Sequence, residues 1–278
     1  MAGAHSGQRR QRISDEPGFL LHRVAWRETS LILDVFTRHH GRVALIAKGA
    51  RRPRSELRPV LLAFQPLRLA WMGRGELQTL TGAEWVGGIE APQAQALICG
   101  FYLNELLIRL LPRDDAHPQL YDAYLQAIIE LTELDASEHE ECLRRFEWTL
   151  LRESGYAPDL ELDCDGLRID GQARYRWVPE LGFQRLELSR SEQADCSDDQ
   201  QDWLEGYSLQ ALAQGVLEHA RQRQQAKRLT RRILGHCLEG RELYTRKMLF
   251  DLHAMTQSLG ISEQVFAISE KTAWLNLA

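Results

Sequence analysis

The chain has 278 residues, 44% of them hydrophobic and 26% charged, which is the composition of an ordinary globular protein with one or two domains. No apolar run approaches the roughly 20 residues that a membrane-spanning helix needs, and residues 1–12 are polar and basic, unlike a signal peptide. The five cysteines are odd in number, widely spread and without a Cys-x-x-Cys pair, which argues against a disulfide framework and a zinc site. We therefore expect a disordered basic tail at residues 1–12 and a cytoplasmic protein.

The net charge of −5 hides an uneven distribution along the chain. Residues 1–60 contain 12 Lys or Arg and 5 Asp or Glu, and residues 221–250 contain 9 and 2, so each segment carries about +7. Two basic segments in an otherwise acidic chain suggest a polyanion partner. A solvated basic surface is the alternative, and for the first segment the clustering of charges on predicted turns favours anion binding.

Five short stretches with the apolar runs or the alternation typical of strands predict a β module at residues 13–87. Turn residues between the second and third stretches predict a hairpin, and two glycines before the fifth predict a tight turn. Strands this short, in so few residues, predict a closed five-stranded barrel of the oligonucleotide-binding (OB) type, with an open sandwich as the alternative. The stretches are Gly18–Trp26, Leu31–Thr37, Arg42–Lys48, Pro66–Trp71 and Glu76–Trp85.

The third predicted strand runs directly into a loop rich in positive charge. Gly49 and Pro53 end the strand pattern, and the loop carries Lys48, Arg51, Arg52, Arg54 and Arg58. Arginine suits phosphate because its planar guanidinium donates two parallel hydrogen bonds, and no device for reading bases is visible. We therefore predict sequence-independent nucleic-acid binding by this loop, together with basic residues near the strand ends, which are Arg23, Arg27, Arg38 and Arg42.

Four aromatic residues of the β module have two possible roles. They either pack in the barrel core, which the apolar alternation around them favours, or stack on bases. They are Trp26, Phe36, Trp71 and Trp85.

From about residue 92 the apolar spacing becomes helical, which predicts a mainly helical domain at residues 92–256. Its helices are expected at 93–111, 120–134, 138–153, 209–220, 222–238 and 244–253. A turn-rich insert at about 156–190, with a small hairpin, interrupts them, and residues 257–278 form a C-terminal tail. The helix at 222–238 is amphipathic and basic, and it offers a second DNA-binding face through Arg228, Arg231 and Arg232.

No catalytic or metal-binding motif fits its surroundings. Gly73-Arg74-Gly75 lies between predicted strands, so it is a turn and not a dinucleotide loop. Asp163-Cys164-Asp165-Gly166 begins like a calcium loop but lacks the spacing and the terminal Glu, and His39-His40 has no partner at ligand spacing. We predict no enzyme activity, no cofactor and no metal; a metal-dependent nuclease using Asp163 and Asp165 is a competing hypothesis.

Several sequence phrases, in this order, resemble a known family. They are WRETSLILDVFT at 26–37, GRVALIAKGAR at 41–51, FQPL at 64–67, YLNELL at 102–107, LRRFE at 143–147 and GRELYTR at 240–246. Together they are similar to the bacterial recombination mediator family RecO over about residues 13–253. The resemblance implies an α+β architecture, with an N-terminal five-stranded OB-fold barrel and a mainly α-helical domain.

The resemblance also implies a non-enzymatic role in DNA repair and recombination. Members of the family bind single- and double-stranded DNA, anneal complementary strands, bind the acidic C-terminal tail of the single-strand-binding protein SSB, and work with RecR to place RecA on SSB-coated DNA. We expect a nucleoid-associated monomer with these partners and no membrane contact. An RNA- or ribosome-associated OB adaptor without annealing activity is the alternative.

Two site predictions depend on this resemblance. An SSB tail ends in apolar residues and a carboxylate, so its receptor should be an apolar groove with an arginine at one end; Arg144, Arg145 and Arg109 on predicted helices are the candidates. Some family members carry a four-cysteine zinc cluster in the insert. Only Cys164 and Cys196 fall in that region here, so we expect a zinc-finger-like insert without zinc.

Overall fold

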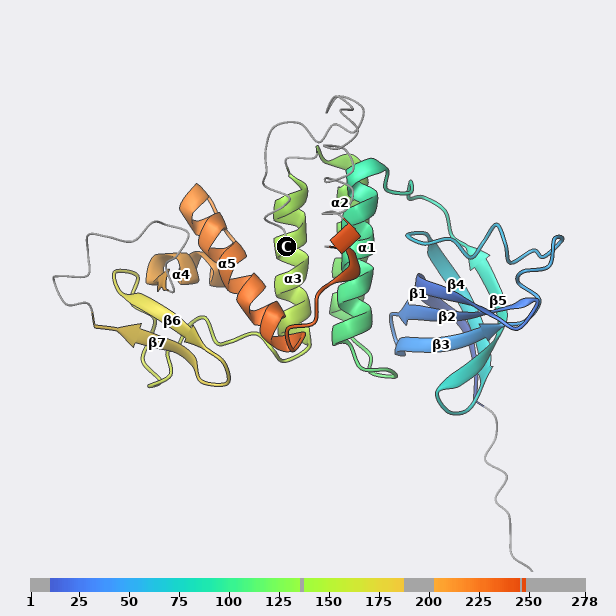
Figure 1. The fold of residues 1–278 in the computed structure, drawn as a ribbon, viewed down its shortest axis with the longest axis horizontal. Helices are drawn as coiled ribbons and strands as arrows, with labels where there is room; N and C mark the ends of the chain where they lie inside the picture. Colours follow the sequence, from blue (N-terminus) through green and yellow to red (C-terminus); the bar gives the residue numbers. More distant parts are fainter. Residues whose placement is uncertain (1–10, 136–137, 188–202, 246, 249–278) are drawn as a thin grey trace, which may run out of the picture. The chain divides into compact units, whose positions relative to one another are not determined.

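The computed structural model describes residues 11–135, 138–187, 203–245 and 247–248, and its N-terminal part is a barrel (Figure 1). The strands are β1 (Gln11–Trp26), β2 (Ser30–Thr37), β3 (Gly41–Ala47), β4 (Pro66–Gly73) and β5 (Leu77–Trp85). They close in the order β1-β2-β3-β5-β4, with β3 and β5 parallel and the other neighbours antiparallel. The predicted OB-type barrel is therefore confirmed, and the open sandwich is wrong.

β1 is longer than the predicted Gly18–Trp26 because it serves two edges of the barrel. Its first half, from Gln11 to Phe19, pairs with β4, and its second half, from Gly18 to Trp26, pairs with β2. The register shifts between Ile13 and Glu16 interrupt the alternation of apolar and polar residues. The first half consequently carries no clear strand pattern in the sequence.

Inward-facing side chains from every strand fill the barrel. Leu33 and Val35 of β2, Leu45 of β3 and Trp71 of β4 are each at most 1% exposed. Leu61, from the segment between β3 and β4, is also 1% exposed and belongs to the same cluster. The segment that carries the basic loop is therefore anchored in the barrel core.

The helical elements lie close to their predicted positions, with two differences. They are α1 (Ala94–Leu110), α2 (Pro118–Glu133), α3 (His139–Glu153), α4 (Gly206–Gln214) and α5 (Ala220–Cys237), with the hairpin β6 (Arg174–Val178) and β7 (Gly182–Leu186) before α4. β8 (Leu204–Glu205) was not predicted and pairs with β6. α4 ends at Gln214, not 220, because Gly215 takes a left-handed conformation (φ 74°) that stops the helix. Of the helix predicted at 244–253, only residues 244–245 and 247–248 are described.

Contacts divide the chain into two compact units. Of the described residues, the first unit contains 11–135, 138–142, 243–245 and 247–248, and the second contains 143–187 and 203–242. The barrel, α1 and α2 thus belong to one unit, although the sequence suggested a domain boundary between residues 87 and 92.

A buried polar and aromatic contact joins the barrel to α1 and α2. The side-chain amide of Asn104 on α1 donates a hydrogen bond to the carbonyl of Leu21 on β1, with an N–O distance of 3.0 Å, and accepts one from the hydroxyl of Tyr124 on α2. The ring centre of Phe19 lies 5.0 Å from that of Tyr124 in an edge-on arrangement. All four residues are at most 4% exposed, so helices and barrel share a core.

The insert of the second unit is organised by backbone hydrogen bonds to a buried carboxylate. Asp163 accepts from the amides of Asp165 (3.0 Å) and Leu167 (2.9 Å), and the amide of Cys164 donates to the carbonyl of Phe183 (2.8 Å). Within the described ranges, no cluster of three His, Cys, Asp or Glu residues is placed to hold a metal ion. Because Cys196 lies outside those ranges, the expectation of a zinc-free insert stays a prediction.

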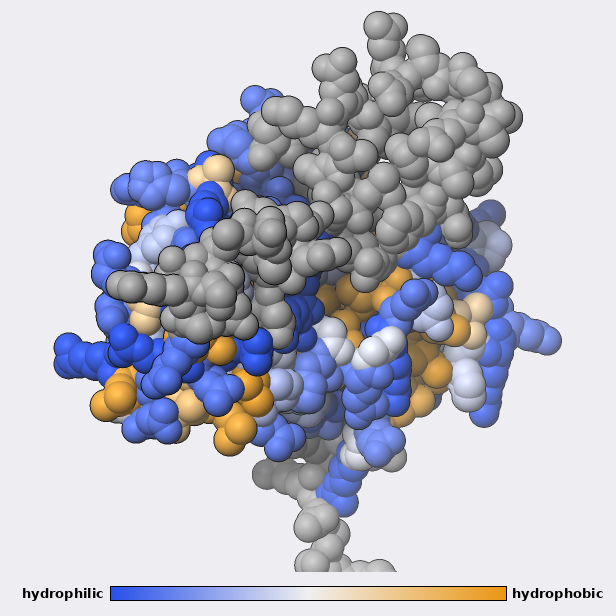
Figure 2. Space-filling view, turned by 60° about the vertical axis from the view of Figure 1, so that its left-hand side comes forward, coloured by the Kyte–Doolittle hydropathy of each residue, from blue (hydrophilic) through white to orange (hydrophobic). Residues whose placement is uncertain are grey.

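Two surface properties bear on partners. Hydrophobic residues reach the face drawn in Figure 2 as separate patches between hydrophilic ones, an ordinary pattern for a protein surface. In the part of the chain that the structure describes, we find no helix with the length and apolar character needed to cross a membrane.

Candidate nucleic-acid interface

The basic loop after β3 is fixed to the turn between β1 and β2. Gly49, with φ 73°, turns the chain away from β3 in a conformation that favours glycine. The amide of Arg51 then donates to the carbonyl of Thr29 (2.9 Å), and its guanidinium donates to the carbonyl of Arg27 (3.1 Å). The loop and the turn therefore present their basic residues as one surface.

Seven basic residues on this surface, which we call the cationic surface, share two properties. All seven are exposed, and none forms an ion pair with a carboxylate of the described residues. Two of the guanidiniums donate to backbone carbonyls: that of Arg51 to Arg27 (3.1 Å) and that of Arg23 to Leu61 (2.9 Å). The positive charge is not neutralised by these contacts. The seven residues are Arg23, Arg27, Lys48, Arg51, Arg52, Arg54 and Arg58.

A hollow of about 430 Å³, which we call the loop hollow, opens within the cationic surface. Three arginines, Arg23, Arg51 and Arg58, contribute to its wall, and no acidic residue does. The rest of the lining is hydrocarbon, from Leu31, Ala50, Leu57, Leu61 and Leu62. Sequence reasoning did not single out Leu57, Leu61 and Leu62; for Leu61 and Leu62 the signal was an apolar run, Val60 to Phe64, immediately after the basic segment.

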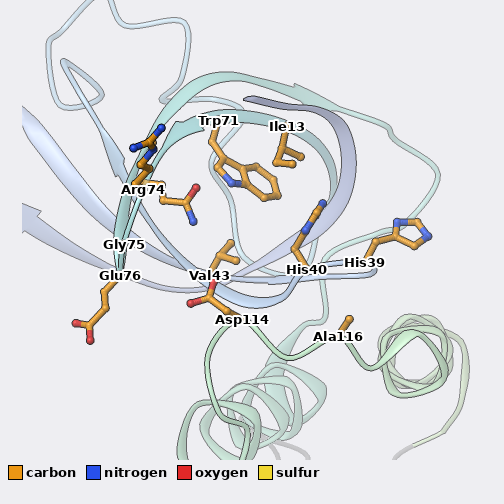
Figure 3. A pocket seen from close by; sticks show the side chains of 12 residues that line it. Ile13, His39, His40, Val43, Trp71, Arg74, Gly75, Glu76, Asp114 and Ala116 are labelled. Atoms are coloured by element: carbon orange, nitrogen blue, oxygen red, sulfur yellow. The ribbon is translucent and has the colours of Figure 1, made fainter. Parts of the chain in front are cut away.

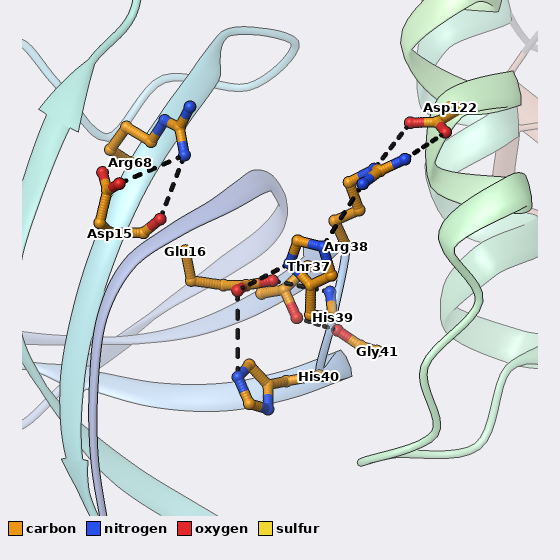
Figure 4. A network of polar contacts seen from close by, with 9 residues as sticks. All are labelled: Asp15, Glu16, Thr37, Arg38, His39, His40, Gly41, Arg68 and Asp122. Carbon is orange, nitrogen blue, oxygen red and sulfur yellow. Dashed lines mark hydrogen bonds and ion pairs between the residues drawn. The ribbon is translucent and has the colours of Figure 1, made fainter.

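Four other predicted arginines have carboxylate partners, and we call them the paired arginines. Arg38 forms a two-pronged contact with Asp122 of α2, at 3.0 Å and 2.7 Å (Figure 4). This hydrogen bonding lowers the pKa of Asp122 below its usual value. Arg38 was predicted to bind DNA, but here it joins the β2–β3 turn to α2.

Arg42 is the second paired arginine, and its side chain is only 12% exposed. It contacts Asp34 at 3.2 Å, and Arg113, which sequence reasoning had not considered, reaches the same carboxylate oxygen at 2.9 Å. Burial raises the pKa of Asp34 despite these two cations. The buried ion pair makes Arg42 a structural residue, so its prediction as a phosphate contact is not supported by its geometry.

The other paired arginines were candidates for the SSB tail. Arg144 is 7% exposed and lies 2.7 Å from Glu147, which is fully buried. Arg109 lies 2.7 Å from Glu105, and its guanidinium is 5.0 Å from the ring centre of Tyr244. Arg144 was expected on the helix surface, but it is buried. It therefore cannot form the exposed end of a groove. Arg145 is exposed and remains a candidate.

The predicted basic residues of α5 are half-buried. The guanidinium of Arg232 lies 5.9 Å from the ring centre of Trp177, within the range of a cation–π contact. DNA binding by Arg228, Arg231 and Arg232 stays a prediction.

Two of the four aromatic candidates are buried and two are exposed. Trp71, at 1% exposure, belongs to the barrel core, whereas Phe36, at 0%, packs against Tyr121 and Tyr124 of α2. Trp26 and Trp85 are 40% and 59% exposed, and Trp85 donates its indole N–H to Gln65. Trp26 precedes Arg27 on the β1–β2 turn, so it is the aromatic residue placed beside the cationic surface.

A second hollow, of about 490 Å³, offers a contrast (Figure 3). Its lining combines Arg74 and two histidines with the carboxylates of Glu76 and Asp114. The neighbouring Glu16 is buried and accepts hydrogen bonds from the amide (2.7 Å) and ring Nδ1 (3.2 Å) of His39 (Figure 4). These contacts secure the β2–β3 turn. The mixed charge of this hollow is poorly suited to phosphate.

The fold and its surface define a class of protein in which an OB-type barrel with an un-neutralised cationic loop is joined to a helical domain. Residues 12–89 match the family model described as Recombination protein O N terminal, and residues 92–246 match Recombination protein O C terminal. The chain belongs to the Recombination protein O (RecO) family, as the sequence phrases indicated.

Similar proteins cover nearly the whole chain. A protein from Polynucleobacter asymbioticus, named DNA repair protein RecO, is 46% identical over 247 residues, which are 87% of this chain and 97% of that protein. Proteins of the same name from Aromatoleum aromaticum and Ralstonia nicotianae are 45% identical (88% of this chain, 99% of theirs) and 41% identical (91% and 90%).

Proposed function

We propose that this chain is a recombination mediator that binds single- and double-stranded DNA through phosphate contacts and anneals complementary strands. Its family is one of DNA repair and recombination proteins, and the chain shares that role. The observation that carries the proposal is the cationic surface, on which seven exposed basic residues have no carboxylate partner among the described residues.

The proposed action is non-covalent. Two strands repel each other through their phosphates, and a surface that neutralises several phosphates lowers this repulsion while releasing counterions. Guanidinium groups held by backbone carbonyls, as in Arg23 and Arg51, lose little further freedom when a phosphate binds. Phosphate contacts carry no sequence information, which suits annealing of any complementary pair.

We propose the same partners that the family resemblance implies: SSB through its acidic tail, RecR, and indirectly RecA, with the chain acting as a monomer at the nucleoid. For the SSB tail, the exposed Arg145 is a better candidate than Arg144 and Arg109, whose side chains are only 7% and 19% exposed. Replacing Arg145 with Glu should then weaken binding of an SSB-tail peptide.

Annealing of SSB-coated complementary strands tests the proposal. The wild-type protein should accelerate duplex formation at low salt and lose this effect as salt rises. The triple variant R51A/R52A/R54A should bind DNA at least about tenfold more weakly, with a reduced salt dependence. No acceleration by the wild-type protein, or stronger binding to RNA without annealing, would favour the adaptor hypothesis instead.

A further inference from the structure

We propose that the loop hollow binds one unpaired base of a DNA strand whose phosphates lie on the cationic surface. This inference rests on the proposed function and adds a ligand class to it. The hollow would make the surface distinguish an unpaired strand from a duplex, which phosphate contacts alone do not do.

The lining of the hollow sets two requirements for its ligand. Its hydrocarbon portion can contact an apolar or flat aromatic group, and Leu62 is 45% exposed although it lies among arginines. Its wall contains three arginines and no acidic residue, so the same ligand must carry negative charge. A nucleotide combines both properties, because its base presents π-faces and its phosphate is anionic.

The arginines are already in place for such a ligand. The guanidinium of Arg23 is held by the carbonyl of Leu61, and that of Arg51 by the carbonyl of Arg27. A guanidinium has five N–H donors, so one carbonyl contact leaves others for a phosphate. Hydrocarbon and donors are therefore presented together without rearrangement.

Only an unpaired base can use the hydrocarbon lining. In a duplex the faces of each base are covered by stacking, and exposing one costs unstacking energy. In single strands, gaps and frayed ends this cost is small, so a base can leave its neighbours and bury part of its face against the leucines of the hollow. The volume of about 430 Å³ lies within the range of about 300–1,000 Å³ found for small-molecule sites.

The wider charge distribution favours a nucleic acid over an acidic peptide. The basic residues continue beyond the hollow to Arg27, Lys48, Arg52 and Arg54, which suits a strand with a negative charge on every phosphate. The mixed hollow of Figure 3, with Glu76 and Asp114 in its lining, lacks this character. A base is therefore expected in the loop hollow and not in the second one.

The test compares two 30-residue strands, oligo(dT) and an abasic strand with the same phosphates and no bases, by fluorescence anisotropy with the full chain. Burying about 55 Å² of the apolar surface of a base corresponds to about a tenfold gain in affinity, so the wild-type protein should bind oligo(dT) about tenfold more tightly than the abasic strand. Leu62→Asn, which changes no charge, should remove most of this difference while leaving affinity for the abasic strand unchanged. Leu77→Asn on β5, at a position 42% exposed and outside the hollow, is the matched control and should behave like wild type.

Each outcome supports or overturns the inference. Equal wild-type affinity for both strands, or equal effects of the two leucine variants, would overturn it while leaving phosphate binding intact. If Leu62→Asn lost binding to an acidic peptide that ends in an apolar residue but still bound oligo(dT) like wild type, the hollow would be a peptide site and the inference would be wrong. Failure of the wild-type protein to bind the abasic strand at low salt would instead contradict the proposed function.

Discussion

The cationic surface and the paired arginines are built from the same residue type in the same chain, yet their surroundings give them opposite roles. Arg51 and Arg23 are held by backbone carbonyls and keep an un-neutralised charge. Arg38 and Arg42 contact the carboxylates of Asp122 and Asp34. The carboxylate neighbour, and not the arginine itself, decides whether a basic residue is available to an external anion.

The largest effect that the comparison predicts is on stability, at the most deeply buried pair. Glu147→Ala should reduce the free energy of unfolding by about 3–5 kcal/mol, because it leaves Arg144 buried without this carboxylate. Urea denaturation measures the change. Glu141→Ala, at an exposed position of the same helix, is the control and should cost under about 1 kcal/mol. Similar losses in the two variants would show that the Arg144–Glu147 pair is not a structural requirement.

A matched pair of methionine substitutions distinguishes the paired arginines from the cationic surface directly. Arg42→Met should lower the free energy of unfolding by about 1–3 kcal/mol, because it leaves the buried Asp34 with fewer partners. The same variant should change DNA affinity by less than about twofold. Arg52→Met should do the reverse, with little change in stability, DNA binding weakened about threefold and the salt dependence reduced by roughly 0.7 of a counterion. Denaturation and anisotropy titrations on both variants are required. Weakened DNA binding in Arg42→Met alone would reverse the assignment.

Removing a carboxylate should convert a paired arginine into an available one. Asp122→Asn leaves Arg38, whose side chain is 38% exposed in the wild-type structure, without its ionic partner. DNA affinity at low salt should rise about twofold, with a slightly steeper salt dependence. Stability should fall by less than about 1 kcal/mol, because the pair is largely exposed. An unchanged affinity would mean that DNA does not pass near the β2–β3 turn.

The smallest expected effect concerns pH. Burial raises the pKa of Asp34 in the folded chain above its ordinary value of 3.8, so the folded state keeps this proton to higher pH than the unfolded state does. The corresponding stability is fully present below the unfolded pKa and is lost as pH rises through the folded pKa. Asp34→Asn cannot ionise, so the stability of wild type minus that of the variant should decrease as pH rises through this window. Urea denaturation across a pH series measures the trend; a constant or increasing difference would contradict it.

The barrel was largely predictable from the sequence because its strands are apolar or alternating runs between clear turns. The first half of β1 was not, since its register shifts between Ile13 and Glu16. The end of α4 was missed because Gly215 stops a helix whose apolar pattern continues. Each miss occurs where a backbone irregularity overrides the periodic signal.

For the candidate site, the sequence located the basic residues but could not separate the arginines that are available to an anion from those that are paired with carboxylates. The partners of Arg38 and Arg42, which are Asp122 and Asp34, come from separate elements, and residue 122 is 84 positions from residue 38. The apolar lining of the loop hollow also depends on tertiary structure, because Arg23 and Leu31 reach it from β1 and β2. Charge clusters are visible in a sequence, whereas neutralisation depends on folding.

The Asn104 contact also determines where the chain can be cut. The two family models meet between residues 89 and 92, but Asn104 and Tyr124 lie beyond this point and pack against Leu21 and Phe19 of the barrel. A fragment ending at residue 89 would expose the rings of Phe19 and Phe36 to water and leave the carbonyl of Leu21 without its donor. The boundary between the two matched regions therefore runs through a single hydrophobic core. Amides of β1 and α1 are expected to exchange with solvent through one shared opening event.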